Sequence, residues 1–342
     1  MEKKSVYYGY NYDLLLGDGL VLAANRRICF QLSLPVILLR FAAVISHFFH
    51  MCFTIGYVSK QTSPMRIIIL AFCGCLLLTT CKKTDSLSGP TTLLNQAYGP
   101  DARQKMDIYL PAARSADSTK LIVLIHGGGW NEGDKADFTS YTSYLQTLLP
   151  GYAIININYR LAANGQNLFP TQENDVKTAA GFIYSKRSEY RISDKWVFLG
   201  ASAGGHLALL QSYKYNSPVI PKAVVSFFGP SELTSLYNAP NPLIALLLLT
   251  VTGTTPSLNP GLYQQSSPFS FITAQSPPTL LLQGGADPLV PPTQSAMVND
   301  KLKSLGVVSQ YVYYPNDGHG WEGTDLIDSF DKIAAFLKAN VH

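Results

Sequence analysis

From residue 96 to the end of the chain, short apolar runs of strand length alternate with longer segments in which apolar residues recur at helical spacing. The run LIVLI at 121–125 is apolar throughout, which is typical of a strand buried on both faces. Strands are predicted at 106–110, 121–125, 153–158, 196–199, 223–228, 279–283 and 310–314. Helices are predicted at 139–149, 173–188, 203–213, 293–305 and 324–339. This alternation predicts an α/β domain over 96–342, with a mostly parallel central sheet and helices on both faces.

One segment, 231–276, departs from this alternation. It carries an apolar run at 243–249 among many Pro, Ser, Asn and Thr residues. A short and very apolar helix outside the regular order is expected to form a small lid or a wall of the substrate pocket. An additional core helix is the alternative.

The N-terminal part of the chain has a different pattern and is predicted to lie outside the folded domain. Met65 and Arg66 precede an apolar run that ends in small residues before Cys81. These are the proportions of a secretory signal, and the run is too short for a comfortable membrane span. The ending Leu78-Thr79-Thr80-Cys81 resembles the lipobox of bacterial lipoproteins, in which the cysteine becomes the lipid-carrying N-terminus.

Residues 65–81 are therefore expected to be a lipoprotein-type signal peptide, with Cys81 as the lipidation site and 82–95 as a tether. The protein would then be an exported bacterial cell-envelope lipoprotein, in the periplasm or at the outer membrane, with a lipid anchor as its membrane contact. A plain signal or a signal-anchor helix is the alternative. Residues 1–64 are expected to be a mis-called extension upstream of a true start at Met65, and an extra membrane segment is the alternative.

Charge and cysteine content narrow the function classes. Of the 342 residues, 14% are charged and 47% are hydrophobic, which argues against a disordered chain. The whole net charge of +4 lies in 1–81, with seven basic and three acidic residues, whereas 82–342 hold 19 of each. A neutral domain without Lys/Arg runs is a poor match for nucleic acid. All five cysteines lie in 1–81, so the domain can form no disulfide, thiolate zinc site or cysteine nucleophile.

The strongest chemical signal is Gly200-Ala201-Ser202-Ala203-Gly204, which follows a predicted strand and opens a predicted helix. This is the setting of a G-x-S-x-G nucleophile elbow, in which a serine occupies a strained turn and needs small neighbours. The turn exposes the hydroxyl at the positive end of the following helix. Ser202 is therefore the candidate nucleophile.

A glycine-rich loop, His126-Gly127-Gly128-Gly129-Trp130, follows the predicted strand at 121–125. Three glycines let the backbone approach a substrate and turn its N–H groups toward it. Such donors stabilise the oxyanion of an acyl-transfer intermediate. A phosphate-binding loop does not fit, because neither a G-x-G-x-x-G spacing nor a P-loop lysine is present here.

Two loops near the C-terminus offer an acid and a base. Asp287 follows the predicted strand at 279–283, and His319 follows the one at 310–314. The order Ser202, Asp287, His319 is that of the α/β hydrolases. Each of the three lies just past the C-terminal end of a strand, where open α/β sheets place their sites.

Other histidines and acids are weaker candidates. His206 points along the helix that follows the elbow, His126 is expected to brace the glycine loop, and His342 is terminal. Asp317 is expected to set a turn, and Asp175 to cap or brace a helix.

Taken together, these motifs resemble those of the α/β-hydrolase esterases, most closely the bacterial feruloyl-esterase-like and hormone-sensitive-lipase-like carboxylesterases. The matching segments are HGGGW, NYRL, FPTQENDVKTAAGFI, GASAGGHLAL, SPPTLLLQGGADPLVP and GHGW, and the resemblance as a whole covers about 96–341. The chain lacks the sizeable helical cap that the hormone-sensitive-lipase pattern carries before HGGG, so the role of a lid is left to 231–276.

The resemblance implies an α/β-hydrolase fold and a set of six functional residues. Ser202 would be the nucleophile, His319 the base and Asp287 the acid that orients it. The oxyanion hole would be formed by the N–H groups of Gly128, Gly129 and Ala203.

These residues predict a serine hydrolase that cleaves carboxylic esters through an acyl-enzyme. A serine hydroxyl needs a base to take its proton, histidine with a pKa of about 6.5 is suited to this, and a carboxylate fixes its tautomer. No metal or other cofactor is expected, since 82–342 show no metal-ligand cluster. The expected substrate is a small-molecule or polysaccharide-linked ester with an acetyl, feruloyl or similar small acyl group, and small lipid esters are the alternative.

Trp130, Trp321, Tyr159, Tyr263 and the run 243–249 are candidates for an apolar pocket wall, with plain packing as the alternative. Two competing functions stay open. One is amide chemistry on the same triad, as in an arylformamidase or a peptidase. The other is a non-catalytic binding protein on a hydrolase scaffold.

Overall fold

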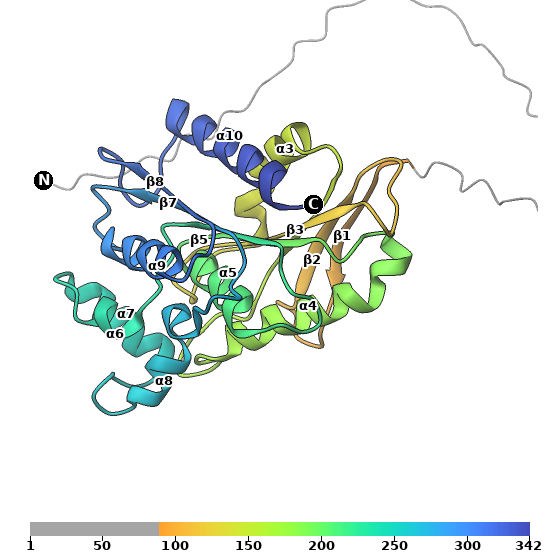
Figure 1. The fold of residues 1–342 in the computed structure, drawn as a ribbon. Helices are drawn as coiled ribbons and strands as arrows, with labels where there is room; N and C mark the ends of the chain where they lie inside the picture. Colours follow the sequence, from red (N-terminus) through yellow and green to blue (C-terminus); the bar gives the residue numbers. More distant parts are fainter. Residues whose placement is uncertain (1–88) are drawn as a thin grey trace, which may run out of the picture. The chain divides into compact units, whose positions relative to one another are not determined.

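An eight-stranded sheet forms the centre of the protein in the computed structural model, which describes residues 89–342 (Figure 1). The strands are β1 (Thr91–Ala97), β2 (Lys105–Leu110), β3 (Lys120–Ile125), β4 (Tyr152–Ile157), β5 (Trp196–Ala201), β6 (Ala223–Phe227), β7 (Thr279–Gly284) and β8 (Ser309–Tyr314). Their order in the sheet is β1-β2-β4-β3-β5-β6-β7-β8. The pairs β1/β2 and β2/β4 are antiparallel, and all other neighbours are parallel. The mostly parallel sheet predicted from the sequence is confirmed.

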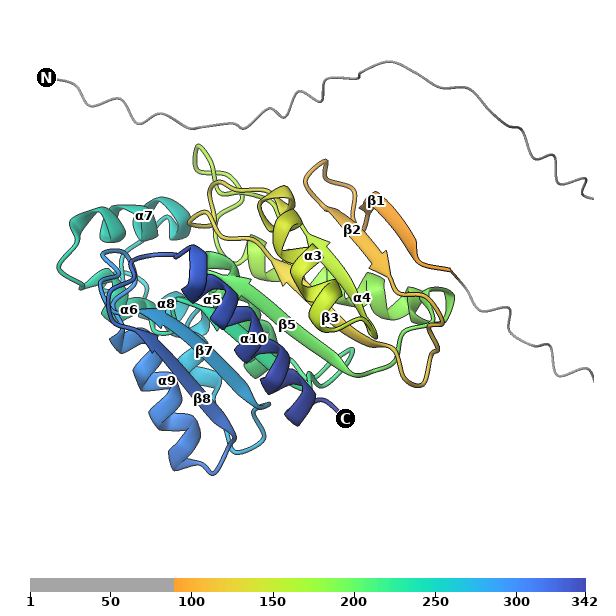
Figure 2. The same ribbon diagram turned by 90° about the horizontal axis from the view of Figure 1, so that it is seen from above.

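Long helices cover both faces of this sheet (Figures 1 and 2). They are α3 (Thr139–Leu148), α4 (Thr171–Tyr190), α5 (Ala203–Lys214), α9 (Thr293–Ser304) and α10 (Gly323–Asn340). Successive residues of β3 serve opposite faces, because side chains alternate along a strand. Val123 and Ile125 belong to the core under α4, α5 and α9, whereas Ile122 and Leu124 belong to the core under α3 and α10. The five helices predicted from the sequence agree with these within two residues at each end.

The sheet begins earlier than predicted. Its first strand starts at Thr91, so the tether expected over 82–95 is wrong in its last part, and the domain begins before residue 96. β1 is an edge strand whose residues are mostly exposed or half-buried, and a bulge interrupts its pairing between Leu93 and Gln96. Such a strand carries little apolar signal. The predicted extension 1–64, the signal 65–81 and the lipidation site Cys81 lie outside the described residues.

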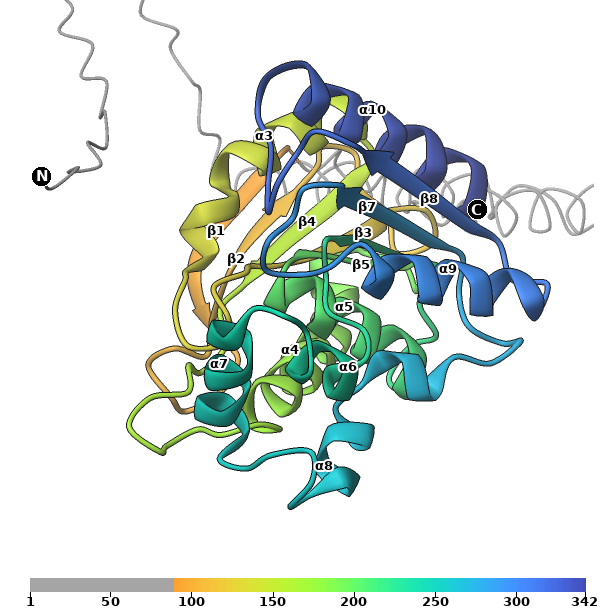
Figure 3. The same cartoon turned by 90° about the vertical axis from the view of Figure 1, so that its left-hand side faces the viewer.

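The segment 231–276 forms four short helices, α6 (Leu233–Tyr237), α7 (Pro242–Thr252), α8 (Pro260–Gln265) and η2 (Pro268–Phe271). α6, α7 and α8 lie on the same side of the sheet as α4 and α5 (Figure 3). Asn241 caps the N-terminus of α7 and Gly253 ends it in a left-handed conformation. The helix buries Ile244 but exposes Leu243 and Leu246, at 66% and 59%. Within 89–342, no helix has both the length and the apolar character needed to cross a membrane.

Candidate active site

Ser202 lies at the junction between β5 and α5, in a backbone conformation that L-residues rarely adopt. Its φ is 54° and its ψ is −122°. Its N–H donates to the carbonyl of Phe227 at 2.9 Å, and its own carbonyl accepts from the N–H of His206 at 3.0 Å. The end of β6 and the first turn of α5 therefore hold the serine in the strained elbow that the sequence predicted.

The glycines of the elbow are required because other backbone lies too close for a side chain. A Cβ on Gly200 would come within 2.3 Å of the Gly204 backbone. A Cβ on Gly204 would come within 2.0 Å of the carbonyl oxygen of Ile125, at the end of β3. The sequence G-x-S-x-G thus lets α5 start directly against the two central strands, and this close approach positions the serine.

His319 and Asp287 lie beside Ser202. The Nε2 atom of His319 is 2.8 Å from the Oγ atom of Ser202, and its Nδ1 atom is 2.8 Å from an Oδ atom of Asp287. The carboxylate of Asp287 is fully buried, whereas the side chain of His319 is 17% exposed. The structure therefore brings the three predicted residues together in one hydrogen-bonded series that reaches the surface at the serine.

The carboxylate of Asp287 is fixed on its other sides by the protein. Its Oδ1 accepts from the backbone N–H groups of Leu289 and Val290 at 2.8 and 2.9 Å. Its Oδ2 also accepts from the side-chain amide of Gln283 at 3.3 Å. Gln283 was not among the residues predicted for the site, and its only signal in the sequence is that a polar side chain closes the apolar run TLLLQ.

The loops that carry the acid and the base pack directly against each other. The N–H of Ala286 donates to the carbonyl of Asp317 at 2.8 Å. A Cβ on Gly284 would come within 2.2 Å of the carbonyl oxygen of Gly318. Two segments far apart in the sequence thereby hold Asp287 and His319 at hydrogen-bond distance.

The glycine loop passes beside the serine: a Cβ on Gly127 would lie only 3.3 Å from the Cβ of Ser202. Gly128 and Gly129 have φ values of 96° and 53°, which an L-residue adopts only under strain. Their N–H groups have no acceptor among residues 89–342, and the N–H of Ala203 belongs to the first residue of α5, where the helix offers no acceptor. These three donors remain available to a ligand.

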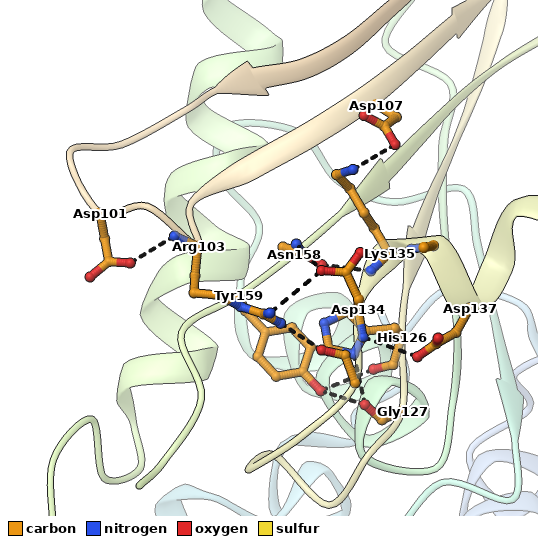
Figure 4. A network of polar contacts seen from close by, with 12 residues as sticks. Asp101, Arg103, Asp107, His126, Gly127, Asp134, Lys135, Asp137, Asn158 and Tyr159 are labelled. Atoms are coloured by element: carbon orange, nitrogen blue, oxygen red, sulfur yellow. Dashed lines mark hydrogen bonds and ion pairs between the residues drawn. The ribbon is translucent and has the colours of Figure 1, made fainter.

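His126 and Tyr159 pack against the backbone of the glycine loop (Figure 4). Both are fully buried, and their rings stack with centroids 4.2 Å apart. The hydroxyl of Tyr159 is 3.0 Å from the carbonyl oxygens of His126 and Gly127, and the Nδ1 of His126 lies 2.7 Å from the latter. Burial lowers the pKa of His126 to about 4, so the ring stays neutral. The role of a brace predicted for His126 agrees with these contacts.

A polar network continues this support toward the edge of the sheet (Figure 4). The side chain of Asn158 accepts from the N–H of Lys135 at 2.6 Å and donates to Asp134 at 2.7 Å. The ammonium of Lys135 is 2.7 Å from Asp107. Arg103 donates to the carbonyl of Gly133 at 2.6 Å. Asn158 and Tyr159 belong to the NYRL motif, so this motif serves to fix the loop that follows β3.

The other residues weighed from the sequence lie away from the reacting groups. His206 is fully buried, with its Nε2 2.7 Å from the carbonyl of Ser266 and its Nδ1 accepting from Trp130 at 3.2 Å. Asp175 is buried and binds the guanidinium of Arg160 at 2.7 Å. It braces the NYRL segment, consistent with the structural role expected.

A pocket of about 510 Å³ opens above Ser202 and His319. One wall is apolar and comes from α6, α7 and the loop after Asp287, with Leu236, Ile244, Leu247, Leu289 and Val290. The opposite wall is the loop after β3, with the glycines, Trp130, Asn131, Glu132 and Asp137. Segment 231–276 therefore supplies a wall of the pocket, which agrees with the prediction that it forms a lid or a pocket wall.

The expected aromatic wall is only partly correct. Trp130 lines the pocket, but Tyr159 lies under the glycine loop and Tyr263 is buried against Tyr237. Trp321 packs behind the site, with its ring 5.4 Å from that of Phe228. Phe228 itself lines the pocket and lies 4.5 Å from the ring of His319. Nothing in the sequence singles it out, because it ends an ordinary apolar strand run.

Among residues 89–342, no cluster of His, Cys, Asp or Glu has the arrangement of a metal site. The chemical groups assembled at the pocket are thus a hydroxyl, an imidazole, a buried carboxylate and backbone N–H donors. This set is suited to acyl transfer through a serine.

Comparison with known proteins places these features in context. Residues 106–302 match the BD-FAE family, a range that includes Ser202 and Asp287 and ends before His319. Esterase LipQ of Mycobacterium tuberculosis is 26% identical over 66% of this chain and 56% of its own length. LipM of the same organism is 30% identical over 68% of this chain and 56% of its own length. The chain thus spans just over half the length of these curated relatives.

A solved structure of a truncated carbohydrate esterase from gut microbiota has the same fold. It superposes with a TM-score of 0.61 at 25% sequence identity, over 74% of this chain and 98% of that chain. The α/β-hydrolase fold and the resemblance to the esterases of that superfamily are confirmed by these matches.

Proposed function

This chain belongs to the BD-FAE family, and from that premise we propose that it is a serine hydrolase of carboxylic esters. The observation that carries the proposal is the series of contacts at the pocket floor. Ser202 Oγ is 2.8 Å from the imidazole of His319, whose other nitrogen is 2.8 Å from the buried carboxylate of Asp287.

In the proposed mechanism the Nε2 atom of His319 takes the proton of Ser202 as the hydroxyl attacks the ester carbonyl. Asp287 holds the proton on Nδ1 and stabilises the imidazolium that forms. His319 then protonates the leaving alcohol, and the acyl group stays on Ser202 until water, activated by the same ring, releases it.

The oxyanion is proposed to bind the N–H groups of Gly128, Gly129 and Ala203. All three donors lie near Ser202 and have no acceptor among the described residues. Removal of one such donor typically lowers the rate by about 10²–10³-fold.

The proposed substrates are small-molecule or polysaccharide-linked esters with acetyl, feruloyl or similar small acyl groups. A pocket of about 510 Å³ is within the range of small-ligand sites and accommodates such an acyl group with part of its alcohol. Support comes also from the carbohydrate esterase whose fold this chain shares. We propose as well that Cys81 carries lipid and anchors the protein in the bacterial cell envelope, on the strength of the preceding sequence alone.

The function is tested by fluorophosphonate labelling together with a substrate panel. We expect labelling of the wild type and none of Ser202→Ala or His319→Gln, while His206→Gln is still labelled. In the panel, p-nitrophenyl acetate and an alkyl ferulate should be cleaved faster than N-formylkynurenine or a dipeptide anilide. Labelling that persists in Ser202→Ala would refute the nucleophile, and preference for the amide substrates would replace esterase by amidase.

A further inference from the structure

The residues that line the pocket include two with a carboxylate side chain and no lysine or arginine. They are Glu132, in the loop after β3, and Asp137, in the short helix η1 (Lys135–Phe138) that follows. Both residues are exposed, and neither forms an ion pair with any residue in 89–342. Two carboxylates without a cationic partner among these residues therefore line the pocket.

The cations nearest this loop are already neutralised. Arg103 is paired with Asp134 at 3.4 Å, and Lys135 is paired with Asp107 at 2.7 Å. Neither cation lines the pocket. The facing wall of Leu236, Ile244, Leu247, Leu289 and Val290 adds no charge. A cleft with charges of one sign and low-dielectric walls focuses the electrostatic potential on its contents.

Building on the proposed ester hydrolysis, we propose that Glu132 and Asp137 select substrates by charge. Esters whose acyl or alcohol part is cationic or neutral are accepted, and esters that carry a carboxylate or sulfonate are disfavoured. The two residues determine specificity and take no part in bond making.

The dimensions of the pocket support an effect of this kind. A volume of 510 Å³ corresponds to a space about 8 Å across, which is close to the Debye length at physiological ionic strength. A charge on either half of a bound ester thus lies within range of both carboxylates. At such distances each carboxylate is expected to change kcat/KM by about three- to tenfold for a singly charged substrate relative to a neutral one.

The experiment uses two series of esters of similar size in which the terminal group changes from cationic to neutral to anionic. One series holds the acetates of choline, 3,3-dimethylbutanol and 3-hydroxypropanesulfonate, and the other holds p-nitrophenyl esters of 4-(trimethylammonio)butyrate, 5-methylhexanoate and glutarate. For the wild type we expect kcat/KM to fall from cation to neutral to anion in at least one series, and the differences to shrink in high salt.

Variants isolate the two carboxylates. Glu132→Gln combined with Asp137→Asn should bring the cation and the anion to within about twofold of the neutral ester. In the structure the carboxylate of Asp137 accepts a hydrogen bond from the N–H of Asp134 at 3.0 Å. The side-chain oxygen introduced by Asp137→Asn can accept the same bond, so the loop should keep its shape. Asp117→Asn, an exposed site just before β3 at the opposite edge of the sheet, serves as the matched control.

The result separates the two proposals. Cleavage of the neutral esters without a charge order, or an order that the double variant leaves unchanged, overturns the selection by charge and leaves the hydrolase intact. Failure to cleave any of the neutral esters overturns the proposed function itself. If kcat/KM falls from cation to neutral to anion in just one of the two series, the selection by charge is supported. That series then identifies the half of the substrate that faces the carboxylates.

Discussion

At the scale of single residues, the site depends on positions where the backbone is strained or where neighbouring backbone leaves no room for a side chain. Ser202 has a φ of 54°, a conformation that costs about 1–3 kcal/mol and persists only where the surroundings enforce it. Hydrogen bonds to Phe227 and His206 hold this conformation. Gly204 permits it, because a Cβ at this position would lie 2.0 Å from the carbonyl oxygen of Ile125.

A pair of glycine substitutions tests this account. Gly204→Ala should lower the free energy of unfolding by about 3 kcal/mol or more, or prevent folding, because rigid backbone surrounds the site. Gly181→Ala, at an exposed position of α4 where a Cβ would have nothing within 4 Å, should raise the free energy of unfolding by about 0.5–1 kcal/mol. Urea unfolding measures both, and equal effects of the two changes would contradict the crowding at the elbow.

The hydroxyl of Tyr159 is expected to matter for rate more than for binding. Tyr159→Phe keeps the stack on His126 but removes the hydrogen bonds to the carbonyls of His126 and Gly127. We expect kcat for p-nitrophenyl acetate to fall about tenfold with little change in KM, because the loop donors lose their alignment. Tyr152→Phe is the matched control, since its buried hydroxyl has no partner in the described structure. An unchanged kcat in Tyr159→Phe would show that the stack alone fixes the loop.

His206 should make stability depend on pH. Burial lowers its pKa to about 4, and its Nδ1 already accepts from Trp130, which leaves no place for a second proton. The unfolded chain takes up a proton near pH 6.5, so the stabilising contribution is complete above that pH and is lost as the pH falls from 6.5 toward 4.

Between pH 7 and pH 5 the free energy of unfolding should therefore decrease by about 2 kcal/mol through this residue. The His206→Gln variant should show a correspondingly smaller decrease in urea titrations at the two pH values. His342→Gln, at the exposed C-terminus, should retain the full decrease. The same slope in all three proteins would contradict a neutral, locked imidazole at 206.

At the scale of elements, α7 is held near both ends by hydrogen bonds to other loops, one of which carries Asp287. The side chain of Asn241 donates to the carbonyl of Pro288, next to Asp287, at 3.0 Å. The carbonyl of Val251, near its C-terminus, accepts from the N–H of Phe169 at 2.9 Å. Between these ends, Leu247 lies over the glycine loop, 3.1 Å from where a Cβ on Gly129 would be. α7 is thus a fixed wall whose side chains set the room above the loop.

Removing one side chain from this wall should change which acyl chain lengths are preferred. Leu247→Ala should raise the ratio of kcat/KM for p-nitrophenyl hexanoate to that for the acetate by about three- to tenfold, because it removes the side chain that limits the pocket above Gly129. Leu246→Ala, one residue earlier on the exposed side of α7, should leave the ratio unchanged. Equal ratios in both variants would assign the limit on acyl length to another wall.

At the scale of the whole molecule, the sequence predicts strands β2 to β8 of the sheet and misses only the edge strand β1. Strands such as β3 and β7 are buried on both faces and therefore read as apolar runs, whereas β1 is half-exposed and polar. Ser202 and Asp287 are predicted because each follows such an apolar run, and His319 because it follows the aromatic and β-branched run QYVYY of β8. Gln283, Phe228 and Glu132 were missed, since their part in the site depends on contacts between loops that no local pattern encodes.

The direction of β1 decides which way the proposed active site faces when the N-terminal side of the domain is fixed. Thr91 pairs with Leu110, at the C-terminal end of β2, and β2 runs antiparallel to β4. The first residue of β1 therefore lies at the N-terminal ends of the parallel strands, whereas Ser202 lies at their C-terminal ends. β1 itself is seven residues long, about 23 Å, and separates the entry point from the catalytic rim. Protein immobilised on beads through a single biotin ahead of Thr91 should therefore hydrolyse bulky polymer-linked esters as fast as free enzyme. Coupling through a residue of α7 should block them. A surface that holds this domain by the N-terminal end of β1 would leave the pocket facing outward, toward large substrates that arrive from solution.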